Sequence, residues 1–295
     1  MIYLHIDVDN LWVYENEFGV KIFPDKEYIY KKSLPFLLKL LKKTNSKATF
    51  MVIGKDVGLK ACQTFCKKAI SEGHEIANHT WSHPISFAKL SQKEKEEEIT
   101  KAHEEIIKVC QQKPVGFRGP GYYEDKEIVS ILKKLEYKYD SSVLPGFSQG
   151  LMTSYALLKG RENRHKTFGK TGYLLSPDKK HFVKGINSNE KLIELPISVL
   201  PFVRLPMHTT FAYFFGPFYR KLILNYLKSK PKYILYLFHA IDFIDLPVKK
   251  AHPVIALRYT FKQRLKFIEE VLQILVEKNG EPLKTSKEIL ISSRR

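Results

Sequence analysis

The chain has 295 residues, of which 44% are hydrophobic, 13% aromatic and 27% charged. This length and composition allow a large folded core and exclude a disordered or fibrous protein. The formal net charge of +18 predicts an anionic partner, such as a nucleic acid, a phosphorylated substrate or an acidic membrane face.

The first 140 residues alternate short apolar runs with longer helical patterns, which predicts repeated βα units and a mostly parallel sheet. A Ser91–Glu94 capping box is expected to open one of these helices, and the acidic run that follows it is assigned no functional role. Strands are expected at residues 3–7, 48–53, 75–78 and 115–118, and helices at 27–43 and 91–110.

The second half begins with residues 146–190, which lack periodicity and are expected to form an insertion or flexible excursion. The most aromatic stretch follows at 196–220, where four prolines and Arg204 exclude a membrane-spanning helix. We treat 146–230 as one inserted segment, a possible lid or membrane contact, within a single domain of residues 1–295. Further strands are expected at 192–195 and 233–238, and a helix at 261–277 that ends near Gly280.

The charge is uneven along the chain. Residues 1–140 carry 23 basic and 20 acidic side chains, whereas residues 141–295 carry 26 and 11, so an anionic partner is expected to meet the second half. The three cysteines have no metal-finger spacing, which favours a reducing compartment. The first residues show no basic leader or cleavage site, so we expect a cytoplasmic protein.

Polar residues follow several of the expected strands, at the sheet edge where ligands bind in α/β folds. Asp7 and Asp9 alternate at the end of the first strand, so both carboxylates point to one side and suit a base and a metal ligand. His79 and His83 are spaced to bind one divalent ion. Each pattern alone also fits a loop cap or a chance spacing.

Two more strand ends carry chemistry. In the Arg118-Gly-Pro-Gly121 segment, backbone N–H groups can approach a substrate oxygen, and the guanidinium can hold a carboxylate such as Asp7. His239 ends the strand at 233–238. A tight turn with a solvent-facing arginine, and a hydrogen-bonded core histidine, are the alternatives.

The ordered series Asp-x-Asp, His-Thr-x-x-His, Arg-x-Pro and Leu-x-His resembles the motifs of the NodB-homology polysaccharide deacetylases, carbohydrate esterase family 4. The resemblance covers residues 3–143 and resumes at 232–245. It implies an α/β fold, a distorted (β/α) barrel, with the segment at about 146–230 inserted. The most specific parts are the segments His79 to His83 and Phe117 to Tyr122.

The resemblance implies a metal-dependent hydrolase that removes an N-acyl group from an amino sugar. One divalent ion is implied, most simply Zn, with Mn, Co and Ni as alternatives. The implied roles are Asp7 as base, His239 as general acid, Arg118 as the partner that orients the base, Asp140 as its supporting acid, Gly121 and Tyr122 at the oxyanion and substrate, and Asp9, His79 and His83 as metal ligands.

The chain also departs from the common family pattern. Val8 separates two acids that are adjacent in many members, and Gly121 stands where an aromatic residue is common. The segments around Asp9 and His239 are similar to deformylases and deacetylases of undecaprenyl-phosphate amino sugars. That similarity implies a polyprenyl-phosphate-linked substrate at the inner face of the cytoplasmic membrane.

The positive, aromatic second half suits a phosphate-bearing lipid and an anionic membrane surface. Residues 196–230 could instead be an ordinary core segment. The whole chain could also be a deacetylase of a soluble or cell-wall-precursor N-acyl sugar, an inactive binding module, or a basic lipid- or nucleic-acid-binding protein. No nucleic-acid-binding motif is present in the sequence, so nucleic acid is not expected as a partner.

Overall fold

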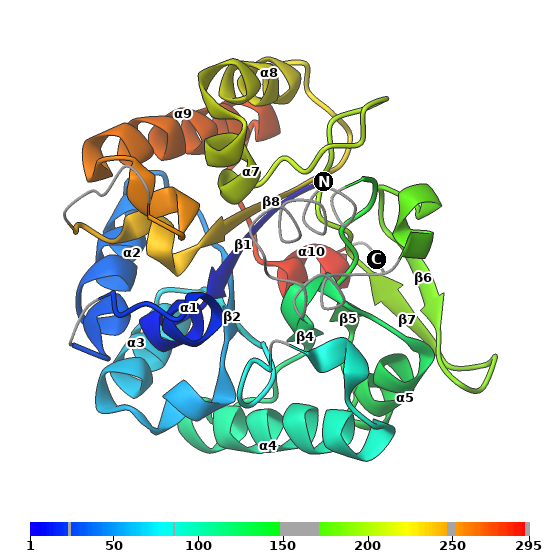
Figure 1. Ribbon diagram of the computed structural model, residues 1–295. Coiled ribbons are helices and arrows are strands. Elements are labelled where there is room, and N and C mark those ends of the chain that lie inside the picture. The colour runs from blue at the N-terminus through cyan, green and yellow to red at the C-terminus, as the bar shows by residue number, and fades with distance from the viewer. Residues whose placement is uncertain (23–24, 85, 148–170, 247–251, 293–295) are drawn as a thin grey trace. The chain divides into compact units, whose positions relative to one another are not determined.

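The computed structural model describes residues 1–22, 25–84, 86–147, 171–246 and 252–292. By its internal contacts the chain divides into two compact units: a first unit of residues 1–50, 56–76 and 207–295, and a second unit of 51–55 and 77–206. Within the described residues the strands follow the order β6-β7-β5-β4-β3-β2-β1-β8 in one sheet (Figure 1). They are β1 (Ile2–Val8), β2 (Thr49–Val52), β3 (Glu75–Asn78), β4 (Gly116–Phe117), β5 (Tyr139–Asp140), β6 (His181–Lys184), β7 (Lys191–Glu194) and β8 (Ile234–His239).

The helices of the described residues connect and cover these strands. No helix among them is both long enough and apolar enough to cross a bilayer. They are α1 (Leu11–Phe18), α2 (Leu34–Lys43), α3 (Lys60–Ser71), α4 (Gln92–Cys110), α5 (Lys126–Lys134), α7 (Thr209–Phe214), α8 (Gly216–Lys228), α9 (Phe261–Asn279) and α10 (Ser286–Ser292).

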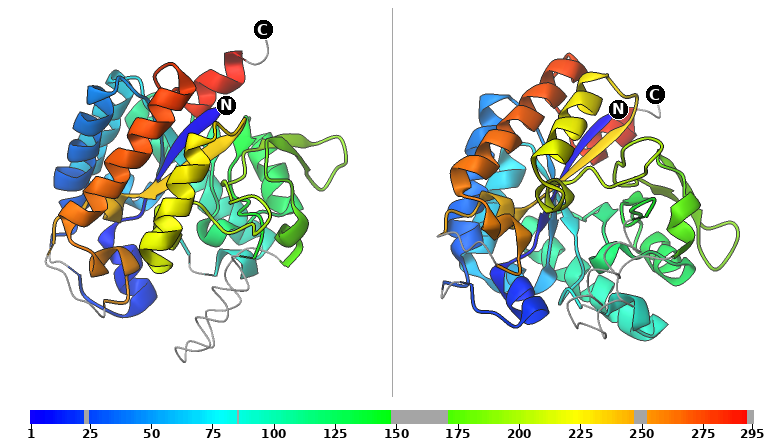
Figure 2. Two further views of the ribbon diagram at one scale, coloured as in Figure 1. Left: turned by 90° about the horizontal axis from the view of Figure 1, so that it is seen from above. Right: turned by 45° about the horizontal axis from the view of Figure 1, so that its top comes forward.

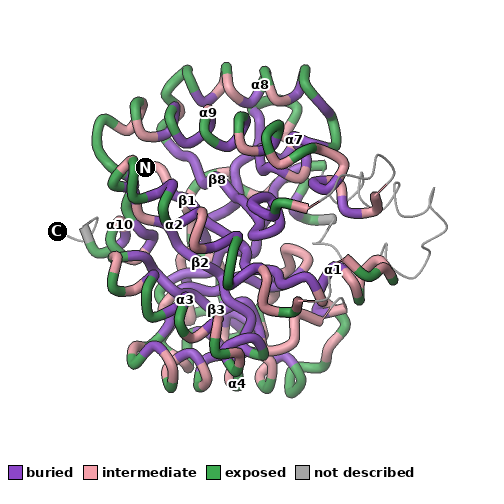
Figure 3. Tube along the Cα trace, turned by 90° about the vertical axis from the view of Figure 1, so that its left-hand side faces the viewer, coloured by how far each residue is buried: buried purple, intermediate pink, exposed green. Residues whose placement is uncertain are grey.

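The first unit is built on the parallel pair β1 and β8, which run side by side from Ile2 opposite Ile234 to Asp7 opposite His239. Every residue of β8 is buried, as is typical of a parallel strand covered on both faces (Figure 3). Helices α8 and α9 of this unit pack against each other (Figure 2). Helix α9 begins at a Thr260–Gln263 capping box and ends at Gly280, in the left-handed conformation.

The second unit contains parallel pairing of β4 with β5 and of β5 with β7, while β6 runs antiparallel to β7. Helix α4 starts at the expected box, because Ser91 and Glu94 each accept a hydrogen bond from the backbone of the other. A core of apolar side chains lies between α4, α5 and the strands, and includes Phe87, Ile99, Phe117, Ile128, Leu132 and Tyr137.

The strands expected from the sequence are confirmed to within one or two residues, but three expectations change. The helix expected at 27–43 begins with a π-helical turn, Ile29–Ser33, because Pro35 has no N–H to continue an α-helical ladder. The end of the aromatic stretch 196–220 lies in two short helices that the sequence did not predict, α7 and the start of α8, where Pro217 stands in the first turn, a position that tolerates proline. Strand β6 lies inside the expected insertion, of which residues 148–170 lie outside the described residues.

Candidate functional site

The predicted base and general acid share the last rung of the β1–β8 pair in the first unit. Asp7 lies directly opposite His239, and Asp7 Oδ2 is 3.9 Å from His239 Nε2. Both residues are buried. Because the two strands are parallel, their carboxyl ends meet at one sheet edge, so the pairing follows from the strand register. A carboxylate and an imidazole at this separation can serve one reaction, one removing a proton and the other supplying it.

His239 is anchored by a neighbour that sequence reasoning did not select. The Asp242 carboxylate accepts a hydrogen bond from the His239 backbone N–H at 2.9 Å and another from the Thr209 hydroxyl. Burial raises the pKa of Asp242, while the His239 charge acts in the opposite direction. The second ring nitrogen of His239, Nδ1, lies 3.5 Å from the Thr210 hydroxyl. The spacing of three residues between His239 and Asp242 was the available signal, since it is that of a capping box.

Asp9 follows β1 immediately and is buried. Its Oδ2 accepts a hydrogen bond of 3.3 Å from the Tyr14 hydroxyl on α1. Helix α1 starts there because the Asn10 side chain caps it, accepting from the Leu11 N–H at 2.7 Å. Asp9 is therefore placed by the strand on one side and by the first turns of α1 on the other.

The two predicted histidine ligands lie on a tight loop after β3 in the second unit. Thr80 and His83 both adopt positive φ angles, 62° and 48°, which turns the loop back on itself. The two imidazole rings consequently lie 4.9 Å apart between centroids. His79 Nδ1 is 2.7 Å from the Arg118 carbonyl oxygen. Because a carbonyl only accepts, this nitrogen carries the hydrogen, and Nε2 keeps the lone pair that a metal needs.

Helix α4 holds this loop in place through two contacts. Asn78 accepts from the Thr80 N–H at 2.8 Å and donates to the Ile99 carbonyl at 3.0 Å. The Glu98 carboxylate accepts from both the backbone N–H and the hydroxyl of Ser82, at 2.8 and 2.7 Å. The acidic run was assigned no functional role, yet one of its members positions the histidine loop. Nothing in the sequence separates Glu98 from the acids beside it.

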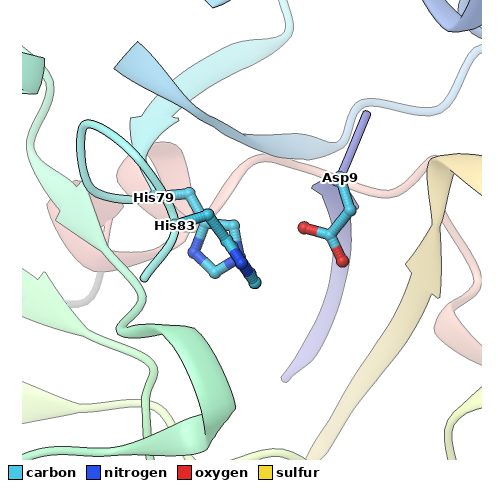
Figure 4. A group of neighbouring side chains, drawn as sticks. All are labelled: Asp9, His79 and His83. Carbon is cyan, nitrogen blue, oxygen red and sulfur yellow. The ribbon is translucent and has the colours of Figure 1, made fainter. Parts of the chain in front are cut away.

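Asp9, His79 and His83 together make a group that could hold a metal ion. Each offers one oxygen or nitrogen atom, and these atoms lie within 4.8 Å of one another (Figure 4). One carboxylate and two imidazoles fit zinc and similar divalent ions, and three protein ligands leave a position for water or substrate. The donor set and the Nε2 lone pair of His79 therefore fit the metal that the resemblance implies.

Arg118 is fully buried, which removes the alternative of a solvent-facing arginine. Its Nε donates to the Ser141 carbonyl, and its Nη2 donates to the Ser141 hydroxyl, both at 2.7 Å. This fork fixes the side chain against the segment that follows β5. That Arg118 also orients Asp7 stays a prediction.

Asp140 ends β5 and accepts through one oxygen, Oδ1, from the Ser141 N–H and the Ser142 hydroxyl. The Ser142 hydroxyl in turn accepts from the Gly119 N–H at 2.8 Å. A short hydrogen-bonded chain thus runs from Asp140 to the loop that follows β4. A Cβ at position 119 would collide with the Tyr123 carbonyl, so this loop needs glycine there. This chain links Asp140 to the loop that carries the predicted oxyanion donor, and its role as a supporting acid stays a prediction.

Gly121 and Tyr122 lie in a 3₁₀ turn, Pro120–Tyr122, with positive φ angles of 66° and 57°. The left-handed conformation at Gly121 costs little because glycine has no Cβ. The turn reorients the backbone directly after the buried Arg118. The roles of Gly121 and Tyr122 toward substrate stay predictions.

Comparison with known proteins gives matches of the kind that the motifs imply. Residues 23–139 match the family model for polysaccharide deacetylase. A peptidoglycan-N-acetylglucosamine deacetylase of Bacillus cereus is 34% identical over 97 residues, 33% of this chain and 32% of the relative. A peptidoglycan-N-acetylmuramic acid deacetylase of Bacillus subtilis is 36% identical over 97 residues, 33% of this chain and 20% of the relative.

A solved structure extends the likeness to the whole fold. The crystal structure of a candidate polysaccharide deacetylase from Mycobacterium smegmatis has a TM-score of 0.60 and 16% identity, with 99% of this chain and 89% of that chain covered. This likeness confirms the expected α/β fold class. In sequence, the matched part spans at most about a third of either relative named above.

Proposed function

We propose that this chain, a NodB-homology polysaccharide deacetylase by its matched residues and its fold, hydrolyses the N-acyl amide of an amino sugar. The observation that carries the proposal is the shared rung of Asp7 and His239. Amide hydrolysis needs a proton removed from water and a proton given to the leaving amine, and these two side chains can do both.

Asp9, His79 and His83 would hold one divalent ion, with zinc the first choice and Mn, Co or Ni able to substitute. A bound ion of this kind polarises the acyl carbonyl and lowers the pKa of water. The Arg118 carbonyl keeps His79 in the tautomer that presents Nε2.

The remaining steps fall to groups of the chain. Asp7 removes the proton of the attacking water, and Arg118 orients Asp7. The Gly121 N–H donates to the developing oxyanion, with Tyr122 beside the substrate. His239 then protonates the leaving amine, held by its backbone bond to Asp242. Asp140 supports the Gly121 loop through Ser142 and Gly119.

The proposed substrate is an N-acetyl or N-formyl amino sugar on a polyprenyl phosphate, met at the cytoplasmic face of the membrane. What supports it is the outer face of α7 and α8. Phe218 is 74% exposed, and Leu222, one turn further along α8, is also exposed. Residues 209–232 contain five basic side chains and no acid. An apolar stripe bordered by cations suits an anionic leaflet and a lipid phosphate.

The alternative interpretation, that residues 196–230 are an ordinary core segment, holds for the inner face of α7 and α8. Phe211, Tyr213 and Tyr219 are buried, whereas Phe214, Phe215 and Phe218 are exposed. The segment therefore supplies core on one side and an apolar surface on the other.

The deciding experiment compares release of acetate or formate from N-acyl amino sugars on polyprenyl phosphate with release from peptidoglycan fragments and free N-acetylglucosamine oligomers. We expect turnover that requires the divalent ion and favours the lipid-linked sugar. Preference for peptidoglycan fragments would keep the deacetylase and overturn the lipid-linked substrate. No release from any of these amides, with the metal bound, would contradict the hydrolase itself.

A further inference from the structure

The second unit contains a buried carboxyl group that the proposed reaction does not use. Glu194 ends β7 and lies in register with Asp140 at the end of β5. On neighbouring parallel strands, residues on one rung point to the same face of the sheet. Both residues have 0% exposure. Two acids thus share one buried rung, without water to screen them.

The hydrogen bonds of the two carboxyl groups are unequal. Asp140 Oδ1 accepts two, from the Ser141 N–H at 2.7 Å and from the Ser142 hydroxyl at 2.5 Å. Glu194 Oε1 accepts one, from the Val143 N–H at 2.9 Å. Among the described residues, neither Asp140 Oδ2 nor Glu194 Oε2 has a hydrogen-bond partner. Burying these two oxygens without hydrogen bonds costs free energy. A proton held between the two carboxyl groups would give both oxygens a hydrogen-bond partner.

The charges around the pair also favour a single negative charge. Arg118, directly after β4, supplies one positive charge, and Glu124 after the Gly121 turn adds a further acid. Tyr173 packs against the same region, and its hydroxyl accepts from the Glu124 N–H. Burial raises the pKa of both Asp140 and Glu194, and the charge of Asp140 raises the pKa of Glu194 further. Two ionised carboxylates here would exceed what one guanidinium can balance.

We propose that Asp140 and Glu194 hold one proton between them, carried by Glu194, so that Glu194 is a neutral carboxylic acid and a positioning residue for Asp140. Asp140 keeps the charge because it accepts the larger number of hydrogen bonds. The charged Asp140 binds the Ser142 hydroxyl, which receives the Gly119 N–H, so the pair sets the position of the Gly119–Tyr122 loop. The link to turnover rests on the proposed hydrolase function, whereas the protonation of Glu194 does not.

The test uses Glu194→Gln, which has the shape of the protonated acid but cannot ionise. Glu190→Gln is the matched control, because Glu190 lies in the same β6–β7 hairpin, is half-buried and has its pKa lowered by the Ser130 hydroxyl. Infrared difference spectra at neutral pH should show a protonated carboxyl band in the wild type and in Glu190→Gln that Glu194→Gln lacks. If the band is the same in all three proteins, Glu194 is ionised and the proposal is wrong.

Urea unfolding from pH 6 to pH 10 gives a second readout. A group with a raised folded-state pKa contributes stability that is lost as pH rises through that pKa, so the wild type should lose stability at alkaline pH and Glu194→Gln should lose less. Equal alkaline losses in the two proteins would overturn the proposal. If Glu194→Gln does not fold, Glu194→Met, also neutral and of similar length, replaces it in both measurements.

Turnover separates a positioning role from a merely structural one. Glu194→Gln should keep kcat within about threefold near pH 7 and extend the alkaline limb of its pH profile, while Asp140→Asn should lower kcat at least tenfold with little change in KM. A Glu194→Gln loss as large as that of Asp140→Asn would contradict a neutral Glu194. Inactivity of the wild type on all amides would count against the hydrolase alone, because the infrared and unfolding results stand without turnover.

Discussion

Asp7 and His239 face each other across the last rung of β1 and β8, with Oδ2 and Nε2 3.9 Å apart. They lie near opposite ends of the sequence, and only the parallel register brings them together. The separate roles of Asp7 as base and His239 as general acid can be tested, because either residue can be substituted without replacing a metal ligand.

His239→Gln should lower kcat by about 10²- to 10⁴-fold, the usual contribution of a general acid, because the amide cannot protonate the leaving amine. Bound metal, measured by elemental analysis of the purified protein, should stay at the wild-type level. The control is His181→Gln on β6, whose Nδ1 lies 2.9 Å from the nearby Lys179 carbonyl oxygen. Wild-type kcat in His239→Gln would show that His239 is not the general acid.

His79→Ala should lose metal and activity together, since it removes a nitrogen ligand. Asp9→Ala should behave in the same way. Metal affinity is measured by titration calorimetry with Zn²⁺, and circular dichroism checks that the fold is retained. His103→Ala is a suitable control, because His103 is also buried in the second unit but bonds to the Tyr137 hydroxyl instead. Wild-type affinity in His79→Ala would contradict the ligand assignment.

The double variant Phe218→Ser/Leu222→Ser should reduce flotation with vesicles that contain anionic phospholipid, because it removes exposed apolar area from α8. Neutral vesicles should bind the wild type more weakly, since residues 209–232 are basic. Phe182→Ser/Ile186→Ser is the matched control, because both residues are also exposed and apolar and lie at and just beyond β6. If both double variants float like the wild type, α8 is not a membrane contact.

His74 predicts a pH dependence of folding. Its ring is buried against Phe50, and its Nδ1 accepts from the Ala48 N–H at 3.2 Å, which requires the neutral form. Burial, with a smaller effect of Lys47, lowers the pKa of His74 to about 4. The unfolded chain binds the proton at a higher pH, so stability is present above about pH 6.5 and is lost as pH falls toward 4.

Between pH 7 and pH 4.5 the loss is about 2 kcal/mol for a shift of this size, measured as the free energy of unfolding in urea. His74→Asn keeps an acceptor for the Ala48 N–H but cannot be protonated, so its stability should fall less over the same range. The same decline in the variant would show that other groups cause it.

Local sequence patterns determined much of the fold. The Ser91–Glu94 box, the apolar periodicity of α9 and the glycine that ends it act within one or two turns of helix, so they can be recognised without the rest of the chain. The strand ends that carry Asp7, His79, Arg118 and His239 were located for the same reason. The sequence did not predict α8, because a proline is compatible with a helix only in its first turn. Whether Pro217 lies in that turn depends on the residue at which the helix starts.

The tertiary structure alone decided which of the many polar residues matter together. Glu98 and Glu194 look in sequence like any other acids, because their roles come from burial and from partners distant along the chain or across a strand pair, whereas a capping-box spacing marks Asp242. Burial removes water from around a carboxyl group, and the strand register determines which residue lies beside it. An acid in such a place can hold a backbone N–H, as Asp242 does, or keep a proton, as we propose for Glu194. The sequence thus determined the residues available at the strand ends, and the strand register and desolvation decided which of them face one another.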